Sequence, residues 1–299
     1  MWKFTAAQVF AIAPLLLGDT ALSATGQDSA SVGTHELSIS SHDTRLSGTV
    51  VIPGESPVVA AVVFVQGAGP DLRMRFLADA LARFGVAVLV YDKRGVGRSG
   101  GVYVGDKPGD VNGSRENLNL LADDATAAFD ALRNEQELHD VPKGFIGHSQ
   151  AGWIVPLAAV KARGTRFIVL WSGAVETTHE DVRFEMLAAA PDFWDHHTHA
   201  EALSLLNDSN TMAFAWADFD PRTALDQLKI PGLWIYGGRD RNVDVDLSIE
   251  RLEGLIAHGH ANYGYRLYPS YDHQLGHFSV DMIRSTVEWI RKVVGRETR

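Results

Sequence analysis

The order of apolar and polar residues predicts β-strands along most of the chain. Segments 35–40 and 45–52 alternate apolar with polar side chains, and the turn-forming residues 41–43 between them favour an antiparallel hairpin. The segment 58–65 is a nearly unbroken β-branched run, which is typical of a strand buried on both faces. The same signature returns at 86–91, 144–147, 167–171, 233–236 and 265–268.

Helical patterns separate these strands. They lie at 72–84, 117–133, 150–163, 245–257 and 280–294. Strands that alternate with helices predict an α/β fold in which a mostly parallel sheet carries helices on both faces. The alternation stops at about 174–228, where helical segments and large aromatics occur without a clear strand. We therefore expect a helical cap over the carboxyl ends of the strands, the edge at which open α/β sheets bind ligands.

Length, charge and cysteine content narrow the class of protein. A chain of 299 residues favours a single large domain. The net charge of −10, without a basic cluster, makes nucleic acid a poor partner. The absence of cysteine excludes thiol catalysis, disulfides and thiolate metal sites.

The N-terminal residues have the layout of a signal peptide. Lys3 precedes an apolar run over 6–17, and Ala21-Leu22-Ser23 places small residues at the expected cleavage positions. The run is too short to span a bilayer, and no other segment is long and apolar enough to do so. We therefore expect export to the periplasm or outside the cell after loss of residues 1–23. The mature domain would then be 24–299, with no stable membrane insertion.

Ser149 is the candidate nucleophile. It lies in Gly147-His148-Ser149-Gln150-Ala151-Gly152, between a short predicted strand and a predicted helix. A serine on such a tight turn has its hydroxyl lifted clear of the sheet, provided that small residues stand two positions away on each side. Gly147 and Ala151 meet that need. A helix-capping serine in a glycine-rich turn is the structural alternative.

A serine hydroxyl needs a base, and the base needs an orienting carboxylate. In this architecture they follow in the order Ser, Asp, His, each in a loop after a strand. Asp240 directly follows the strand at 233–236, whereas Asp244 and Asp246 stand where a helix begins. His273 follows the strand at 265–268, and His277, closer to the last helix, remains a second candidate base.

The oxyanion hole should combine two backbone N–H groups. One is that of Gln150, the residue after the nucleophile, and the other comes from the loop Gln66-Gly67-Ala68-Gly69-Pro70 after the first long strand. We select Ala68 as the second donor. A plain glycine turn is the alternative for this loop.

The motifs at 67–70, 91–99, 147–152 and 237–240 resemble those of the α/β-hydrolase superfamily. More narrowly, they are similar to bacterial, often exported, esterases and to serine-aminopeptidase-like (S33-type) hydrolases, over most of the chain from about residue 35. The resemblance implies Ser149, Asp240 and His273 as catalytic triad and a structural loop at 92–99. The chain departs from many relatives at Gln66, where they have histidine, and at Ala151, where they have glycine.

Three features of the predicted cap bear on the ligands that it could bind. Asp195-His196-His197-Thr198-His199 has no second ligand pair at a known spacing, so a solvated face is favoured over a metal site. The cap aromatics favour an apolar acyl or alkyl group. The cap also carries carboxylates, one of which could bind a substrate ammonium if it faced the site: Glu176, Glu180, Asp181, Glu185, Asp192 and Asp195.

These observations predict a carboxylesterase-like serine hydrolase without cofactor or metal. The expected substrates are small-molecule esters of small to medium acyl chain. Aminopeptidase or amidase action and thioester hydrolysis are alternatives on the same fold, and a non-catalytic binding module is a more distant one. The oligomeric state does not follow from the sequence.

Overall fold

The fold is an eight-stranded sheet flanked by helices. The computed structural model describes residues 32–54, 56–105, 111–208 and 213–295. The strands stand in the order β1-β2-β4-β3-β5-β6-β7-β8, with antiparallel pairs β1–β2 and β2–β4 and parallel pairing from β4 to β8. Their bounds are β1 Val32–Ser41, β2 Thr44–Pro53, β3 Ala60–Val65, β4 Val86–Tyr91, β5 Lys143–His148, β6 Thr165–Trp171, β7 Gly232–Gly237 and β8 Tyr263–Tyr268.

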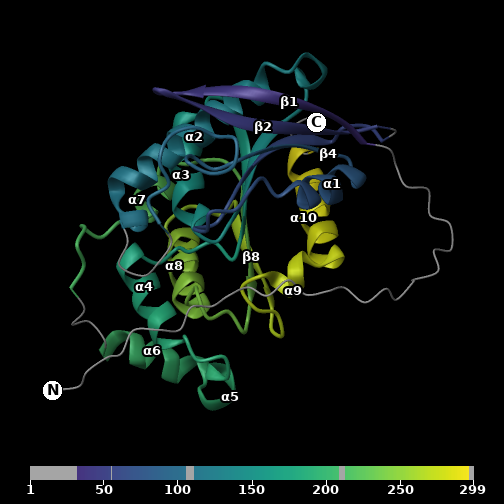
Figure 1. The fold of residues 1–299 in the computed structure, drawn as a ribbon. Helices are drawn as coiled ribbons and strands as arrows, with labels where there is room; N and C mark the ends of the chain where they lie inside the picture. The colour runs from purple at the N-terminus through teal and green to yellow at the C-terminus, as the bar shows by residue number, and fades with distance from the viewer. Residues whose placement is uncertain (1–31, 55, 106–110, 209–212, 296–299) are drawn as a thin grey trace, which may run out of the picture.

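Helices cover both faces of this sheet. Figure 1 shows α2, α3 and α8 on one side and α1 and α10 on the other. The bounds are α1 Arg75–Arg83, α2 Arg115–Arg133, α3 Ala151–Lys161, α8 Val245–Ala257, α9 Leu275–Phe278 and α10 Val280–Val294, with short 3₁₀ turns at Val111–Gly113 and Gln136–Leu138. The mostly parallel α/β sheet that the sequence predicts is confirmed.

The apolar core has one layer on each face of the sheet. One layer joins the inner faces of α2, α3 and α8 to the strands, with Phe129 and Phe145 stacked at 5.0 Å between ring centroids. The other layer joins α1 and α10 to the opposite face. Every residue of β3 and β4 is buried, which explains why these strands read as continuous apolar runs rather than alternating ones.

Helices rather than strands connect β6 with β7. They are α4 Thr178–Leu187, α5 Phe193–His196, α6 His199–Asp208 and α7 Arg222–Leu225. In Figure 1, α4 lies alongside α8, α6 and α5 lie beyond both, and α7 lies beside α3. Phe184, Phe193, Ala202 and Leu206 form a small apolar cluster of their own there. This segment is called the cap below.

The predicted element bounds need one physical correction. The helix expected over 72–84 begins only at Arg75, because Arg73 leaves the helical path to bind Asp92, with its Nη2 atom 2.8 Å from Oδ2. The predicted signal segment 1–23 lies outside the described residues. None of the helices in the described ranges is long and apolar enough to cross a bilayer.

Candidate active site

Ser149 stands on a strained turn between β5 and α3. Its φ angle is +58°, in the left-handed region that non-glycine residues rarely adopt. The turn is tight, since a Cβ on Gly147 would lie only 2.5 Å from the Cβ of Ala151. Small residues at both positions are therefore a steric requirement, which alanine at 151 satisfies.

The structure brings Ser149, His273 and Asp240 together. His273 Nε2 lies 2.9 Å from Ser149 Oγ, and His273 Nδ1 lies 2.8 Å from Asp240 Oδ2. The Asp240 carboxylate can only accept hydrogen bonds, so Nδ1 carries the proton and Nε2 is left to accept the serine proton. Asp240 is fully buried, and the main-chain N–H groups of Asn242 and Val243 also donate to its Oδ1.

The alternative candidates for the orienting carboxylate and for the base lie elsewhere in the structure. Asp244 caps α8 by accepting from Leu247 N at 3.1 Å, and Asp246 pairs with His199 at 2.7 Å. His277 is exposed, and no contact within the described residues joins it to Ser149. The loop position of His273, directly after β8, thus places it and not His277 beside the serine.

The electrostatics of His273 suit a base. Burial disfavours its charged form, but the charge and hydrogen bond of Asp240 outweigh burial and raise the pKa of His273 above its ordinary value. The imidazolium that forms when His273 takes a proton is therefore stabilised where it arises.

His148 is a site residue that sequence reasoning missed. Its Nε2 atom lies 3.1 Å from the main-chain oxygen of His273. A carbonyl oxygen cannot donate, so His148 Nε2 carries the proton in this contact. Burial, followed by the neighbouring His273, lowers the pKa of His148 to about 3, which keeps its ring neutral. His148 thereby joins the turn that carries Ser149 to the loop that carries His273.

The two predicted oxyanion donors lie on segments that meet at Ser149. A Cβ on Gly67 would lie 3.1 Å from Ser149 Cβ and 3.5 Å from its Oγ, so the 66–70 loop passes directly over the serine. Within the described part of the chain, the N–H groups of Ala68 and Gln150 donate to no protein acceptor. Both are therefore available to a bound group.

Asn112 links these two segments. The side chain of Gln150 donates to the main-chain oxygen of Asn112 at 3.2 Å, and Asn112 Nδ2 is 3.5 Å from the oxygen of Ala68. Tyr103 also donates to that oxygen, at 2.9 Å. Neither residue belongs to a motif, so no sequence signal pointed to them.

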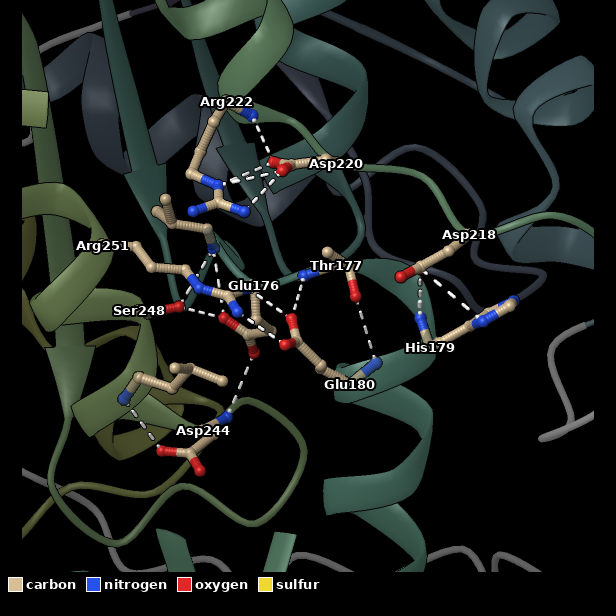
Figure 2. A network of polar contacts seen from close by, with 12 residues as sticks. Glu176, Thr177, His179, Glu180, Asp218, Asp220, Arg222, Asp244, Ser248 and Arg251 are labelled. Atoms are coloured by element: carbon tan, nitrogen blue, oxygen red, sulfur yellow. Dashed lines mark hydrogen bonds and ion pairs between the residues drawn. The ribbon is translucent and has the colours of Figure 1, made fainter. Parts of the chain in front are cut away.

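The cap is attached to the site loops by polar contacts. Figure 2 shows Glu176 between Ser248 and the main-chain N–H of Asp244, with the Arg251–Glu180 ion pair beside it. Outside that view, Trp194 Nε1 donates to the main-chain oxygen of Asp240 at 2.7 Å. The cap therefore contacts the same loop that carries the orienting carboxylate.

The cap histidines have separate partners. His196 pairs with Asp192 at 3.1 Å, His197 stacks on Phe193, and His199 reaches Asp246. Among the described residues, no three histidines or acidic side chains are grouped as metal ligands.

Comparison with known proteins gives one partial family match and several solved structures with a similar fold. The family model of the S33 serine aminopeptidases matches residues 56–194. No curated protein matches the chain. Similar solved structures include an esterase from Pyrococcus furiosus (TM-score 0.62, 18% identity, 87% of this chain and 91% of that one). An esterase from Pyrobaculum calidifontis is similar at TM-score 0.56 and 17% identity, over 89% of this chain and 85% of that one. A third, the acylaminoacyl peptidase of Pyrococcus horikoshii, gives TM-score 0.60 and 15% identity, over 87% of this chain but 41% of that one.

Proposed function

Because the chain has the α/β-hydrolase fold, we propose that it is a serine hydrolase that cleaves carboxylic esters of small to medium acyl chain. The observation that carries this proposal is the continuous hydrogen-bonded chain from Ser149 Oγ through His273 to Asp240, at 2.9 and 2.8 Å. Such a chain activates a hydroxyl that is otherwise a weak nucleophile.

The proposed reaction uses each group at a defined atom. His273 Nε2 takes the Ser149 proton while Oγ attacks the ester carbonyl carbon. The N–H groups of Ala68 and Gln150 donate to the oxyanion that forms. His273 then gives its proton to the leaving alkoxide, and water, activated by the same imidazole, hydrolyses the acyl-enzyme. Asp240 holds the imidazole tautomer and stabilises its cation throughout.

Cleavage of an amide at a peptide N-terminus is the second candidate function. Most of the cap carboxylates are engaged by the protein itself, since Glu180 pairs with Arg251 and Asp195 with Arg239. Asp181 differs from them. Burial and the carboxylates of Glu176, Glu185 and Asp240 disfavour a negative charge on Asp181 and raise its pKa well above the ordinary range. The same crowding of carboxyl groups would favour a substrate ammonium placed among them.

The test compares p-nitrophenyl esters of increasing acyl length with alanine p-nitroanilide. We expect wild-type turnover to be highest on an ester, and Ser149→Ala to lower it by several orders of magnitude. Preference for the anilide, together with a raised KM for the anilide alone in Asp181→Asn, would favour the aminopeptidase. Ester turnover that is indifferent to Ser149→Ala would reject the serine mechanism.

A further inference from the structure

Lys93 is a buried cation in the loop that follows β4. Its side chain and main chain together are only 4% exposed. The ammonium donates to three successive carbonyl oxygens, those of Gly67, Ala68 (3.0 Å) and Gly69 (3.1 Å). An ammonium carries three N–H donors. Three hydrogen bonds therefore join this ammonium to the 67–69 loop.

This contact fixes the direction of the peptide that joins Gly67 to Ala68. The described chain contains no cis peptide, so this one is trans. In a trans peptide the C=O and N–H bonds point in opposite directions. Because the Gly67 oxygen is directed at Lys93, the Ala68 N–H points away from the ammonium. A flipped peptide would lose that hydrogen bond and turn the N–H toward the cation.

The same peptide borders the nucleophile. Gly67 is the residue whose added Cβ would meet both Cβ and Oγ of Ser149, at 3.1 and 3.5 Å. The residue whose carbonyl oxygen accepts from Lys93 is therefore also the residue that borders the serine. The next peptide is held as well, since Tyr103 donates to the oxygen of Ala68.

We propose that Lys93 is a positioning residue for oxyanion stabilisation, which keeps the Ala68 N–H directed at the oxygen of a substrate bound to Ser149. Its buried positive charge adds a favourable potential for that oxyanion. The inference rests on the proposed serine mechanism and goes beyond it, because it assigns a role to a residue of the loop that sequence motifs mark only as structural.

Lys143 offers a matched control at the opposite end of the parallel strands. It is 5% exposed, and its ammonium also donates to three carbonyl oxygens, those of Leu138, His139 (3.2 Å) and Val141 (2.9 Å). It is the first residue of β5, whereas Ser149 follows the last residue of that strand. Lys93→Met and Lys143→Met therefore each remove three hydrogen bonds from a buried ammonium to main-chain oxygens. Lys93→Met removes them near Ser149, and Lys143→Met removes them at the far end of the strand.

We expect Lys93→Met to lower kcat on the preferred p-nitrophenyl ester by roughly 10- to 100-fold with little change in KM, as loss of an oxyanion donor does. Lys143→Met should lower Tm but leave kcat unchanged. A trifluoromethyl ketone, which adds to the serine and places an oxyanion in the hole, should bind Lys93→Met more weakly by a factor similar to the loss in kcat/KM. Lys93→Gln, which keeps an N–H donor without the charge, should give an intermediate kcat. This variant replaces Lys93→Met in the test if Lys93→Met does not fold.

Two outcomes would overturn the inference in distinguishable ways. Lys93 would be a purely structural residue if Lys93→Met or Lys93→Gln lowered Tm but left kcat unchanged, as is expected of Lys143→Met, while turnover still required Ser149. If Ser149→Ala left ester turnover intact, the serine mechanism itself would fail, and the role of Lys93 would fail with it.

Discussion

The ring of His148 donates a hydrogen bond to the main-chain oxygen of His273, 125 positions later in the chain. The two imidazole rings are also tilted against each other by 50°, with their centroids 4.9 Å apart. The main chain of His273 is thus held by the residue that precedes Ser149. Ser149 and His273 are therefore linked both directly and through His148.

Replacement of His148 tests this link. His148→Ala leaves the His273 oxygen without its donor, so we expect kcat to fall about 10-fold or more and stability to fall by roughly 1–3 kcal/mol. His148→Gln, whose amide can reach the same oxygen, should recover most of kcat. The measurement is steady-state hydrolysis of one ester together with urea unfolding. Equal losses in both variants would show that the ring matters for packing alone.

The raised pKa of His273 predicts the pH dependence of activity. The protonated imidazole cannot accept the Ser149 proton, so kcat/KM should rise with pH through an inflection above 6.5, the ordinary value. Asp240→Asn removes the charge that raises this pKa. In the residual activity of that variant the inflection should move to lower pH, and kcat should fall by several orders of magnitude. An unmoved inflection would assign it to another group.

The close contact of Gly152 with the loop after β6 predicts a steric effect on stability. An added Cβ would lie 2.4 Å from the nitrogen and 2.6 Å from the oxygen of Ala174, both main-chain atoms that cannot rotate away. We expect Gly152→Ala to destabilise the fold by about 3 kcal/mol or more. Gly254→Ala, in α8 with nothing within 4 Å, should instead stabilise it by about 1 kcal/mol. Urea unfolding of both variants measures the difference.

The raised pKa of Glu176 predicts how the free energy of unfolding depends on pH. Burial, together with the carboxylate of Asp244, raises its pKa from 4.5 to about 8, although Ser248 donates to it. The folded state then keeps a proton that the unfolded chain loses near pH 4.5, so the free energy of unfolding falls as pH rises between these values.

Glu176→Gln removes this titration. The loss of stability between pH 5 and 8 should be smaller in the variant by up to about 4 kcal/mol. His273, whose pKa is also raised, acts in the same direction in both proteins and cancels in the comparison. Parallel stability curves for wild type and variant would contradict the prediction.

Sequence patterns located the elements whose burial is uniform or periodic. The predicted bounds of 86–91, 245–257 and 280–294 coincide with β4, α8 and α10. The two helices begin after side chains that cap them, Asp244 and Ser279. Such signals are local in sequence, and for that reason they can be read without the fold.

The roles of Lys93 and His148 could not be found in the same way. Both side chains bind main-chain oxygens of distant segments, and any residue type supplies a main-chain oxygen. No pattern of residue types therefore marks their partners. Ser149, Asp240 and His273 were identifiable because each needs a specific side chain directly after a strand.

The proposed base, His273, follows a strand at the edge of the sheet. Within the described residues, β8, which precedes His273, pairs with β7 alone, and five of its six residues are partly or fully exposed. A strand at an edge frays more readily than the interior strands that carry Ser149 and Asp240. If His273 is the base, as proposed, heat would accordingly abolish activity while most of the secondary structure was still intact. Such inactivation would be reversible as long as the nucleophile turn and the interior strands stayed folded as a template for β8 to rejoin.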